Sequence, residues 1–436
     1  MKITQSYSRS FIKRCFTCIV AFAMLFGTLA LGGCNSNSNE SSGKIVIWAF
    51  NYYIDTAKEM VKEYQKEHPN VEFEIVELGQ DDLVEKFRIA LASGNKDTLP
   101  DVIVEEYYNL KGYLEFYGNS FADITDYLDP TLYYDFTVQC VTYDNKIWGV
   151  PYDTGVGAWF YREDILREAG FTDADLQDIT WDRFIEIGKV VKEKTGKYLI
   201  PIMPAGNIEG RVILQSTGSW YYDKEGNLDI EGNQALVDMT KTIKELTLSG
   251  VACEVASWDD IIASFYNGES AGVIGGGWWS YIIRENESQS GLWRMALPPR
   301  MTGSESYTNY SNCAGCCWIP LNKDNKKTAI DFLMSTVAVS DDIADTMART
   351  QTVVPALKSG ANTPSAMAGD AYFGNQPIVR IMAEWSEKVP YVNYSSHSYE
   401  IAYGHGDLFP DYIRGKTTIE EVISALQKKA ETIISQ

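Results

Sequence analysis

Short apolar segments alternate with amphipathic stretches in the region that follows residue 43. The segments 44–48, 71–75 and 100–104 carry continuous or alternating apolar residues and predict β-strands. Apolar residues recur at helical spacing over 54–64 and 83–92, which predicts one helix between each pair of strands. The order strand, helix, strand, helix, strand is typical of an α/β domain with a largely parallel sheet.

The same alternation continues after residue 150 and predicts a second α/β lobe. This region predicts, in order, a helix capped by Thr180, a hairpin at 220–230, and helices at 235–248 and 258–266. Near the end of the chain, Thr418 and Glu421 have the spacing of a capping box. They predict the start of a final helix with one apolar face.

The first 43 residues have the pattern of an export signal followed by a leash. Basic residues and no acidic ones precede an apolar stretch at 15–31, which ends in Leu-Gly-Gly-Cys at Cys34. This resembles a lipoprotein signal, so residues 1–33 are predicted to be removed and Cys34 to carry lipid. The polar segment 35–43 predicts a flexible tether. No later apolar run is long enough to span a bilayer, so we expect lipid anchoring alone, at the extracellular face of the cell membrane.

Charge and composition exclude several functions. Lys and Arg total 38 against 59 Asp and Glu, a net charge of −21, whereas nucleic-acid binding needs a basic footprint. Three His residues leave little for a metal centre, and no nucleotide-binding glycine motif is present. We therefore expect neither a metal nor a cofactor. The 11 Trp and 27 Tyr residues are the distinctive feature of the composition.

Five cysteines would remain after signal removal and lipidation: Cys140, Cys253, Cys313, Cys316 and Cys317. Their odd number and spacing do not suggest a disulfide framework. Cys313 and Cys316 form a C-x-x-C pattern, but no second pair could complete a zinc site. We interpret the cluster as small buried thiols in an apolar strand, and the sequence leaves open whether Cys313, Cys316 or Cys317 pair.

One hydrolase motif matches, at 268–272, where Ser270 occupies the centre of G-x-S-x-G. A nucleophile elbow needs a strand before the serine and a helix after it. Here the predicted order is reversed, so a surface esterase using Ser270 remains only a less favoured alternative.

Glu105 and Glu106 end the third predicted strand. Adjacent strand residues point to opposite faces, so the two carboxylates would not flank one scissile bond. One of them would still face a cleft at the carboxyl end of the strand, where α/β sheets place ligands. This favours binding over catalysis.

Several segments together resemble the extracellular solute-binding proteins of carbohydrate ABC importers. They are Lys44–Phe50, Pro100–Val102, Trp148–Asp153 followed by Phe160–Arg162, Thr180–Phe184, Phe265–Gly268, Gly277–Trp278 and Val354–Ala356. The resemblance covers residues 44–436. It implies an α/β fold of two hinged lobes, the first formed by 44–150 plus about 312–356 and the second by 151–311 plus about 357–436.

The resemblance also implies a sugar site between the lobes. Sugar rings stack on aromatic faces, and their hydroxyls need polar partners. We take Trp278, which follows three glycines, as the stacking platform, and Asp153 at the crossover as a hydroxyl acceptor. The other candidates follow the first and third strands or lie in the second lobe: Trp48, Asn51, Tyr52, Glu105, Tyr107, Arg211, Trp220 and His397.

By that resemblance the chain is a monomeric, non-enzymatic lipoprotein that hands a carbohydrate, an oligosaccharide by its aromatic content, to an ABC permease. Alternatives within the binding class are a peptide, a polyamine or glycerol phosphate as cargo. An adhesion or scaffold lipoprotein without a ligand is a third possibility.

Overall fold

The computed structural model describes residues 44–435, so the predicted signal peptide, the tether and Cys34 lie outside the described residues. Within that range, no helix combines the length and the apolar character that crossing a membrane requires.

The first sheet has five strands in the order β2-β1-β3-β12-β6. Their bounds are β1 Ile45–Phe50, β2 Phe73–Leu78, β3 Val102–Glu106, β6 Val150–Pro151 and β12 Cys316–Pro320. The three predicted strands are confirmed, and each ends two or three residues later than predicted. β1 pairs in parallel with β2 and β3, whereas β12 runs antiparallel to β3 and β6. The sheet is therefore mixed, because its fourth strand returns from a distant part of the chain.

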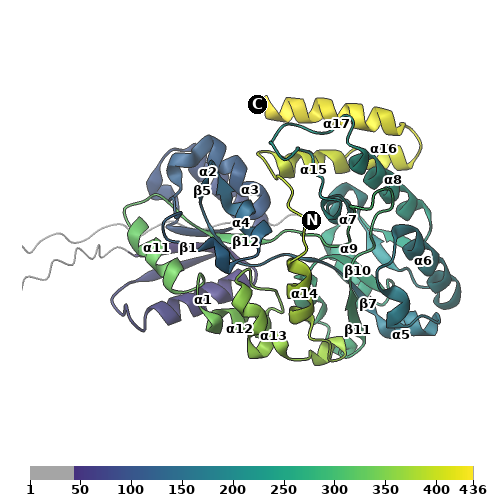
Figure 1. Ribbon diagram of the computed structural model, residues 1–436, viewed down its shortest axis with the longest axis horizontal. Helices are drawn as coiled ribbons and strands as arrows, with labels where there is room; N and C mark the ends of the chain where they lie inside the picture. Colours follow the sequence, from purple (N-terminus) through teal and green to yellow (C-terminus); the bar gives the residue numbers. More distant parts are fainter. Residues whose placement is uncertain (1–43, 436) are drawn as a thin grey trace, which may run out of the picture. The chain divides into compact units, whose positions relative to one another are not determined.

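Helices cover both faces of this sheet. They are α1 Tyr53–Tyr64, α2 Gln80–Ala92, α3 Tyr107–Tyr117, α4 Asp135–Val141 and α11 Lys326–Ser335. In Figure 1, α1 lies below the strands, and α2 and α3 lie above them. A short hairpin joins β4 Thr142–Tyr143 to β5 Lys146–Ile147. Because helices shield both faces, β1 and β3 are buried along almost their whole length.

The second sheet is antiparallel, with the order β10-β7-β11. β7 is Gly157–Arg162, β10 is Gly272–Gly276 and β11 is Trp293–Ala296, and a parallel pair is formed by β8 Ile200–Ile202 and β9 Ala252–Glu254. The helices around them are α5 Glu163–Glu168, α6 Trp181–Thr195, α7 Ile208–Ser216, α8 Gln234–Leu248, α9 Trp258–Tyr266 and α10 Trp279–Ile283. The predicted cap is confirmed, since the Thr180 side chain accepts a hydrogen bond from the backbone N–H of Arg183.

The predicted hairpin at 220–230 forms only as a turn with a single bridge, between Tyr222 and Leu228. The Asp223 carboxylate holds the turn by accepting from the backbone N–H of Asn227 at 2.8 Å. The Tyr222 hydroxyl donates to the carbonyl of Ser396 at 2.6 Å. The segment is thus tied to another part of the chain instead of extending a strand ladder.

Three segments cross between the two sheets and lie side by side. The first joins β6 to β7, the second leads into β12, and the third follows α12. Isolated bridges pair Asp153 with Pro355 and Val156 with Asn312. Backbone hydrogen bonds from Thr154 to Val354, and from Cys313 to Gly155, connect the first segment to each of the others.

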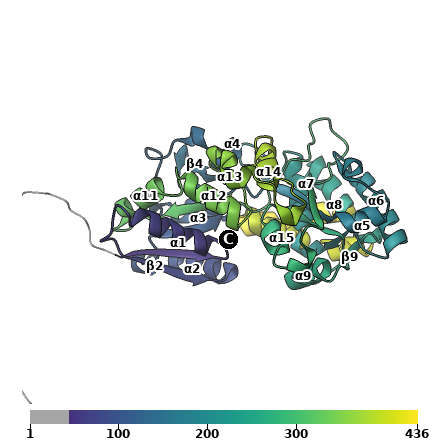
Figure 2. The ribbon, with the colours of Figure 1, turned by 90° about the horizontal axis from the view of Figure 1, so that it is seen from below.

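The chain after β12 returns along both sheets. α12 Asp341–Thr350, α13 Pro364–Met367 and α14 Ile378–Ser386 follow one another in space, as Figures 1 and 2 both show. α15 Ser398–Gly406, α16 Phe409–Ile413 and α17 Ile419–Ile434 complete the fold, and α17 packs on α15 and α8. The capping box of Thr418 and Glu421 is confirmed.

Candidate functional site

A cavity of about 940 Å³ lies where the strand ends of the first sheet face helices that belong to the second. One wall, called the strand wall here, follows β1, β2 and β3. The other, the helix wall, is built from α7, α9, α10 and α15. The residues that line the cavity and carry the argument are Asn51, Tyr52, Tyr53, Gln80, Asp81, Asp82, Glu106, Arg211, Trp258, Trp278, Tyr281, Glu285, Cys313, Cys316, Tyr399 and Tyr403.

The strand wall arises because parallel strands end at the same edge of their sheet. β1 leads into Asn51 and Tyr52, β2 leads into Gln80 and Asp81, and β3 ends with Glu106. Asn51 has φ +46°, a left-handed conformation that Asn tolerates better than most residues and that turns the chain from β1 into α1.

Glu106 is the most deeply placed carboxylate of the strand wall. It is 9% exposed, and it accepts a hydrogen bond from the Gln80 side-chain amide at 2.9 Å. Burial raises the pKa of Glu106, and the positive charge of Arg211 across the cavity acts against that rise. A carboxylate held in this way can accept hydrogen bonds from ligand hydroxyls.

Arg211 projects from α7 toward Glu106. Its Nε donates to the carbonyl of Asn207 at 3.3 Å. Its guanidinium carbon lies 5.7 Å from the ring centres of both Tyr108 and Tyr403, within the range of a cation–π contact. Within residues 44–435, its two terminal nitrogens have no hydrogen-bond partner in the protein, so they can donate into the cavity.

Two indoles, those of Trp258 and Trp278, line the cavity on the helix wall. Trp258 stacks on the buried Trp279 with ring centres 4.6 Å apart, and it lies 5.5 Å from Trp278. The Trp278 N–H donates to the carbonyl of Cys313 at 2.8 Å, so this indole can offer its ring face, but not its N–H, to a ligand. A Cβ on Gly276 would lie 2.1 Å from the Trp278 ring nitrogen. Glycine is therefore required beside the platform.

Asp153 lies beneath the strand wall and does not line the cavity. It is 1% exposed and accepts hydrogen bonds from the hydroxyls of Tyr52 (3.2 Å) and Tyr53 (3.1 Å) and from the backbone N–H of Cys316 (2.9 Å). Burial raises its pKa to about 7, although these hydrogen bonds favour the charged form. Asp153 thus positions two tyrosines that do line the cavity.

Four sequence candidates besides Asp153 are also buried and outside the cavity lining. They are Trp48, Glu105, Tyr107 and Trp220. Trp48 contacts the ammonium group of Lys86, the Tyr107 hydroxyl donates to the carbonyl of Asp153, and Trp220 lies parallel to Tyr108 at 6.1 Å. His397 lines a different hollow, described below.

Glu105 is bound by its own neighbours. Its carboxylate accepts from the backbone N–H of Glu106 (2.9 Å), the amide of Asn109 (3.0 Å) and the hydroxyl of Tyr113 (3.3 Å), and burial raises its pKa to about 7. The alternation along β3 therefore turns Glu106, and not Glu105, into the cavity. Of the sequence candidates, the structure brings together Asn51, Tyr52, Arg211 and Trp278.

Sequence reasoning missed the remaining polar and aromatic groups of the cavity. Gln80, Asp81 and Asp82 follow the second strand, so the rule that located Asn51 and Tyr52 could have found them. Trp258 was interpreted only as a helix start, yet its 38% exposure is unusual for so large a ring. Tyr399 and Tyr403 are four apart on α15 and therefore share a face.

The described cysteines are all free and buried. Cys313 and Cys316 line the cavity. Cys316 and Cys317 lie in β12, as expected for an apolar strand, whereas Cys313 precedes that strand. Burial raises the pKa of the Cys313 thiol to about 11. Among the described residues, no group of His, Cys, Asp and Glu could hold a metal ion.

The esterase alternative finds no geometric support in the described chain. Ser270 is fully buried, and its hydroxyl is bonded to that of Ser264 at 3.0 Å. The ring nitrogens of His405 contact Tyr221 and Thr240 instead.

Comparison with known proteins agrees with this architecture. Residues 59–373 match the family described as bacterial extracellular solute-binding protein. A lactose-binding protein of Rhizobium radiobacter is 32% identical over 97% of this chain and 98% of its own length. An arabinooligosaccharide-binding protein of Halalkalibacterium halodurans is 21% identical over 90% and 89%. Among solved structures, the GacH receptor of Streptomyces glaucescens superposes with a TM-score of 0.75 at 17% identity, over 91% of this chain and 100% of its own. The chain belongs to the bacterial extracellular solute-binding protein family and has its two-lobed α/β fold.

Proposed function

We propose that this chain is the substrate-binding component of an ABC importer, which captures an oligosaccharide outside the cell and delivers it to the membrane permease. The observation that carries the proposal is the pairing of two unlike walls around one cavity. Indole faces lie on one side, and three of the four carboxylates together with two side-chain amides lie on the other. A sugar needs an aromatic wall and a polar wall, because its C–H faces stack on aromatic rings while its hydroxyls require hydrogen-bond partners.

The family and its relatives support the same class of ligand. Two relatives that align along most of this chain are named for binding lactose and arabinooligosaccharides. Family members are binding proteins, and in this proposal no bond of the sugar is made or broken. The permease is the partner that the family implies, and the protein acts as a monomer.

The mechanism follows from the position of the cavity. We assign the first lobe to residues 44–150 plus about 312–356 and the second to 151–311 plus about 357–436. The three crossing segments then form the hinge. A ligand that contacts both walls favours the closed form by its differential affinity for that form. The permease would recognise the closed form, which couples sugar binding to delivery.

The test is a thermal-shift screen of residues 35–436 against mono-, di- and oligosaccharides. A ligand at about 100 times its Kd stabilises the fold by about 2.7 kcal/mol, which is readily measured as a raised Tm. We expect one glycan class to raise the Tm. A screen in which no saccharide of any length does so would overturn the proposal.

A polyamine is the second candidate, because the cavity carries four carboxylates (Asp81, Asp82, Glu106 and Glu285) and a single cation, Arg211. Spermidine and putrescine therefore belong in the same screen. The indole faces could also contact a cation, so the two candidates are separated by salt. Polyamine binding should weaken strongly between 50 and 500 mM NaCl, whereas binding of a neutral sugar should change little.

Anchoring through Cys34 is a separate proposal, supported by the basic, apolar and Leu-Gly-Gly-Cys order that precedes it. A diacylated cysteine would hold the protein at the outer face of the membrane. The Cys34→Ala variant should move from the detergent phase to the aqueous phase in a cloud-point partition of whole-cell extracts. Equal partition of the two forms would refute the anchor.

A further inference from the structure

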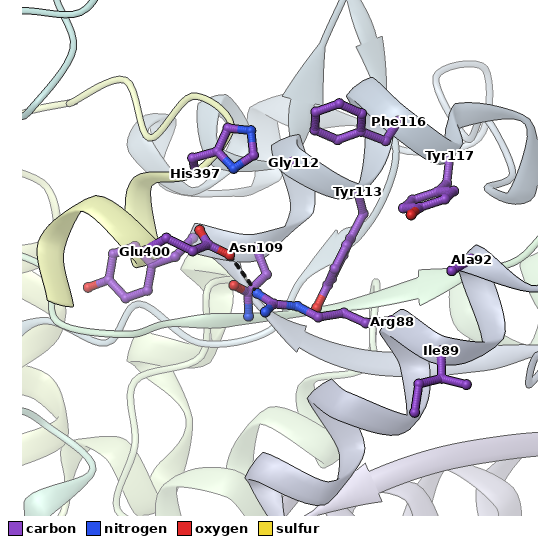
Figure 3. A pocket seen from close by; sticks show the side chains of 11 residues that line it. Arg88, Ile89, Ala92, Asn109, Gly112, Tyr113, Phe116, Tyr117, His397 and Glu400 are labelled. Atoms are coloured by element: carbon purple, nitrogen blue, oxygen red, sulfur yellow. Dashed lines mark hydrogen bonds and ion pairs between the residues drawn. The ribbon is translucent and has the colours of Figure 1, made fainter. Parts of the chain in front are cut away.

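A second hollow, of about 390 Å³, lies beside the central cavity and is called the outer hollow here. Figure 3 shows side chains from α2, α3 and α15 around it. The lining residues are Arg88, Ile89, Ala92, Tyr108, Asn109, Gly112, Tyr113, Phe116, Tyr117, His397 and Glu400. None of them lines the central cavity.

The lining is aromatic, and it is open to solvent. Phe116 is 56% exposed and Ile89 is 62% exposed, values that are high for large apolar side chains. The ring of His397 lies 5.6 Å from that of Phe116. Figure 3 shows Phe116, Tyr117 and His397 at one side of the hollow and Arg88 at the other. Contiguous exposed apolar surface that is rimmed by polar residues often marks a binding site.

Polar groups stand around these rings. Arg88 donates to the Glu400 carboxylate at 2.8 Å, and both side chains remain partly exposed, at 45% and 36%. Asn109 donates its amide to Glu105, while its carbonyl oxygen has no hydrogen-bond partner within residues 44–435. Because Arg88 and Glu400 neutralise one another, the hollow suits an uncharged ligand with several hydroxyls.

Two elements, α2 and α15, line both the outer hollow and the central cavity. α2 contributes Gln80–Asp82 to the cavity and Arg88 to the hollow, which lie about 9 Å apart along the helix at 1.5 Å per residue. α15 likewise turns Tyr399 and Tyr403 to the cavity and Glu400 to the hollow. The Arg88–Glu400 ion pair therefore connects α2 to α15, the two helices that line both recesses.

We propose that the outer hollow is an additional sugar subsite, which holds a terminal ring of a ligand whose other rings occupy the central cavity. The ring would stack on Phe116, with Arg88, Glu400 and the Asn109 carbonyl as hydroxyl partners. The proposal rests on the carbohydrate function proposed above and extends it. The chain binds a saccharide longer than the central cavity alone can hold.

The test compares ligand lengths by isothermal titration calorimetry. The probes are the smallest saccharide that raises the Tm in the screen and the same saccharide lengthened by one and by two rings at either end. For the wild type, we expect one lengthened probe to bind at least 10-fold more tightly than the short one. Phe116→Ala should lose that gain and keep the affinity for the short probe within 2-fold.

Two further variants keep the result interpretable. Ala92→Phe fills the hollow without deleting a ring and should abolish the same gain. Tyr127→Ala removes an aromatic side chain that is 60% exposed elsewhere on the chain, and it should leave every affinity unchanged. The Tm of each ligand-free variant reports folding.

The outcomes separate the two proposals. If the short probe binds to the wild type but no lengthened probe binds more tightly, the subsite is wrong and the carbohydrate function stands. The same holds if Phe116→Ala weakens short and long probes equally, or weakens neither. If no saccharide of any length binds, the carbohydrate function itself fails, and the subsite fails with it.

Discussion

The two walls of the central cavity differ in the kind of contact that they offer to a ligand. The strand wall is polar and is tied together by hydrogen bonds, from Gln80 to Glu106 and from two tyrosines to Asp153. The helix wall is mainly a set of rings, in which Trp258 and Trp278 present indole surface and a single guanidinium projects between tyrosines.

The difference shows which part of the fold contributes orientation and which contributes contact area. Strand ends are fixed by the backbone ladder, so a carboxylate placed there has a defined direction, and a hydrogen bond to a charged group contributes about 1.5–3 kcal/mol. Helix side chains supply wide faces, and burying an aromatic face stabilises a complex with little directional demand. A ligand that satisfies only one wall would bind weakly.

We expect the largest change in sugar affinity when the indole of Trp278, the proposed stacking platform, is removed. Trp278→Ala should raise the Kd for the preferred sugar by roughly 30-fold or more, since central aromatic anchors contribute at least 2 kcal/mol. Trp148→Ala is a matched control, because Trp148 is also half-buried and also donates its N–H to a backbone carbonyl, that of Tyr143. Calorimetry at 25 °C would measure both. Equal losses in the two variants would mean that Trp278 acts through the fold and not through the ligand.

A smaller change in sugar affinity should distinguish the two neighbouring carboxylates of β3, Glu105 and Glu106. Glu106→Gln should weaken sugar binding about 10-fold, because an acceptor that is charged becomes neutral. Glu105→Gln should change the Kd by less than 2-fold, since Glu105 is bound by residues of its own surroundings and does not reach the cavity. Direct titration of both variants measures the contrast. A greater loss from Glu105→Gln would reverse the assignment of the strand wall.

The smallest effect on affinity, and a clear one on stability, is expected from Asp153. Its pKa of about 7 in the folded protein lies above the ordinary value of 3.8, so between these values the unfolded chain loses its proton first. The contribution of Asp153 to the free energy of unfolding therefore falls as the pH rises from about 4 to 7, with a slope of at most ~1.4 kcal/mol per pH unit. Above pH 7 that contribution is constant.

Asp153→Asn removes this pH dependence while it retains an acceptor oxygen. Urea denaturation at several values between pH 4.5 and 8 should show the free energy of unfolding of the wild type falling relative to that of the variant as the pH rises to about 7. The exposed Asp144→Asn serves as the control. Parallel profiles for wild type and Asp153→Asn would contradict the proposed titration.

Sequence patterns predicted the elements of the fold well, because local rules govern them. Apolar periodicity located β1, β2 and β3, and side-chain caps at Thr180 and Thr418 located the starts of α6 and α17. The antiparallel entry of β12 depends on a chain return after residue 300, which no local pattern encodes. The segment at 220–230 shows the same limit, since its contact with Ser396 replaces the expected ladder.

The site was harder to predict than the fold, because the function of a site residue depends on which way its side chain points as well as on where the residue lies in the sequence. The sequence identified the end of β3, but alternation alone cannot tell which of Glu105 and Glu106 faces the ligand. It identified Asp153 as important, yet the side chain lies one layer below the surface that was expected. Trp278 was found because three glycines precede it, whereas Trp258 carries no such local mark.

The three crossing segments have a mechanical consequence. Each is hydrogen-bonded to a neighbour along its path, so sliding or twisting one against the others would break several of these bonds at once. We expect bending of all three segments together to preserve these hydrogen bonds. The aperture of the cavity is then described by a single angle, and one distance between a pair of spin labels, one on each lobe, would follow the whole cycle of capture and release.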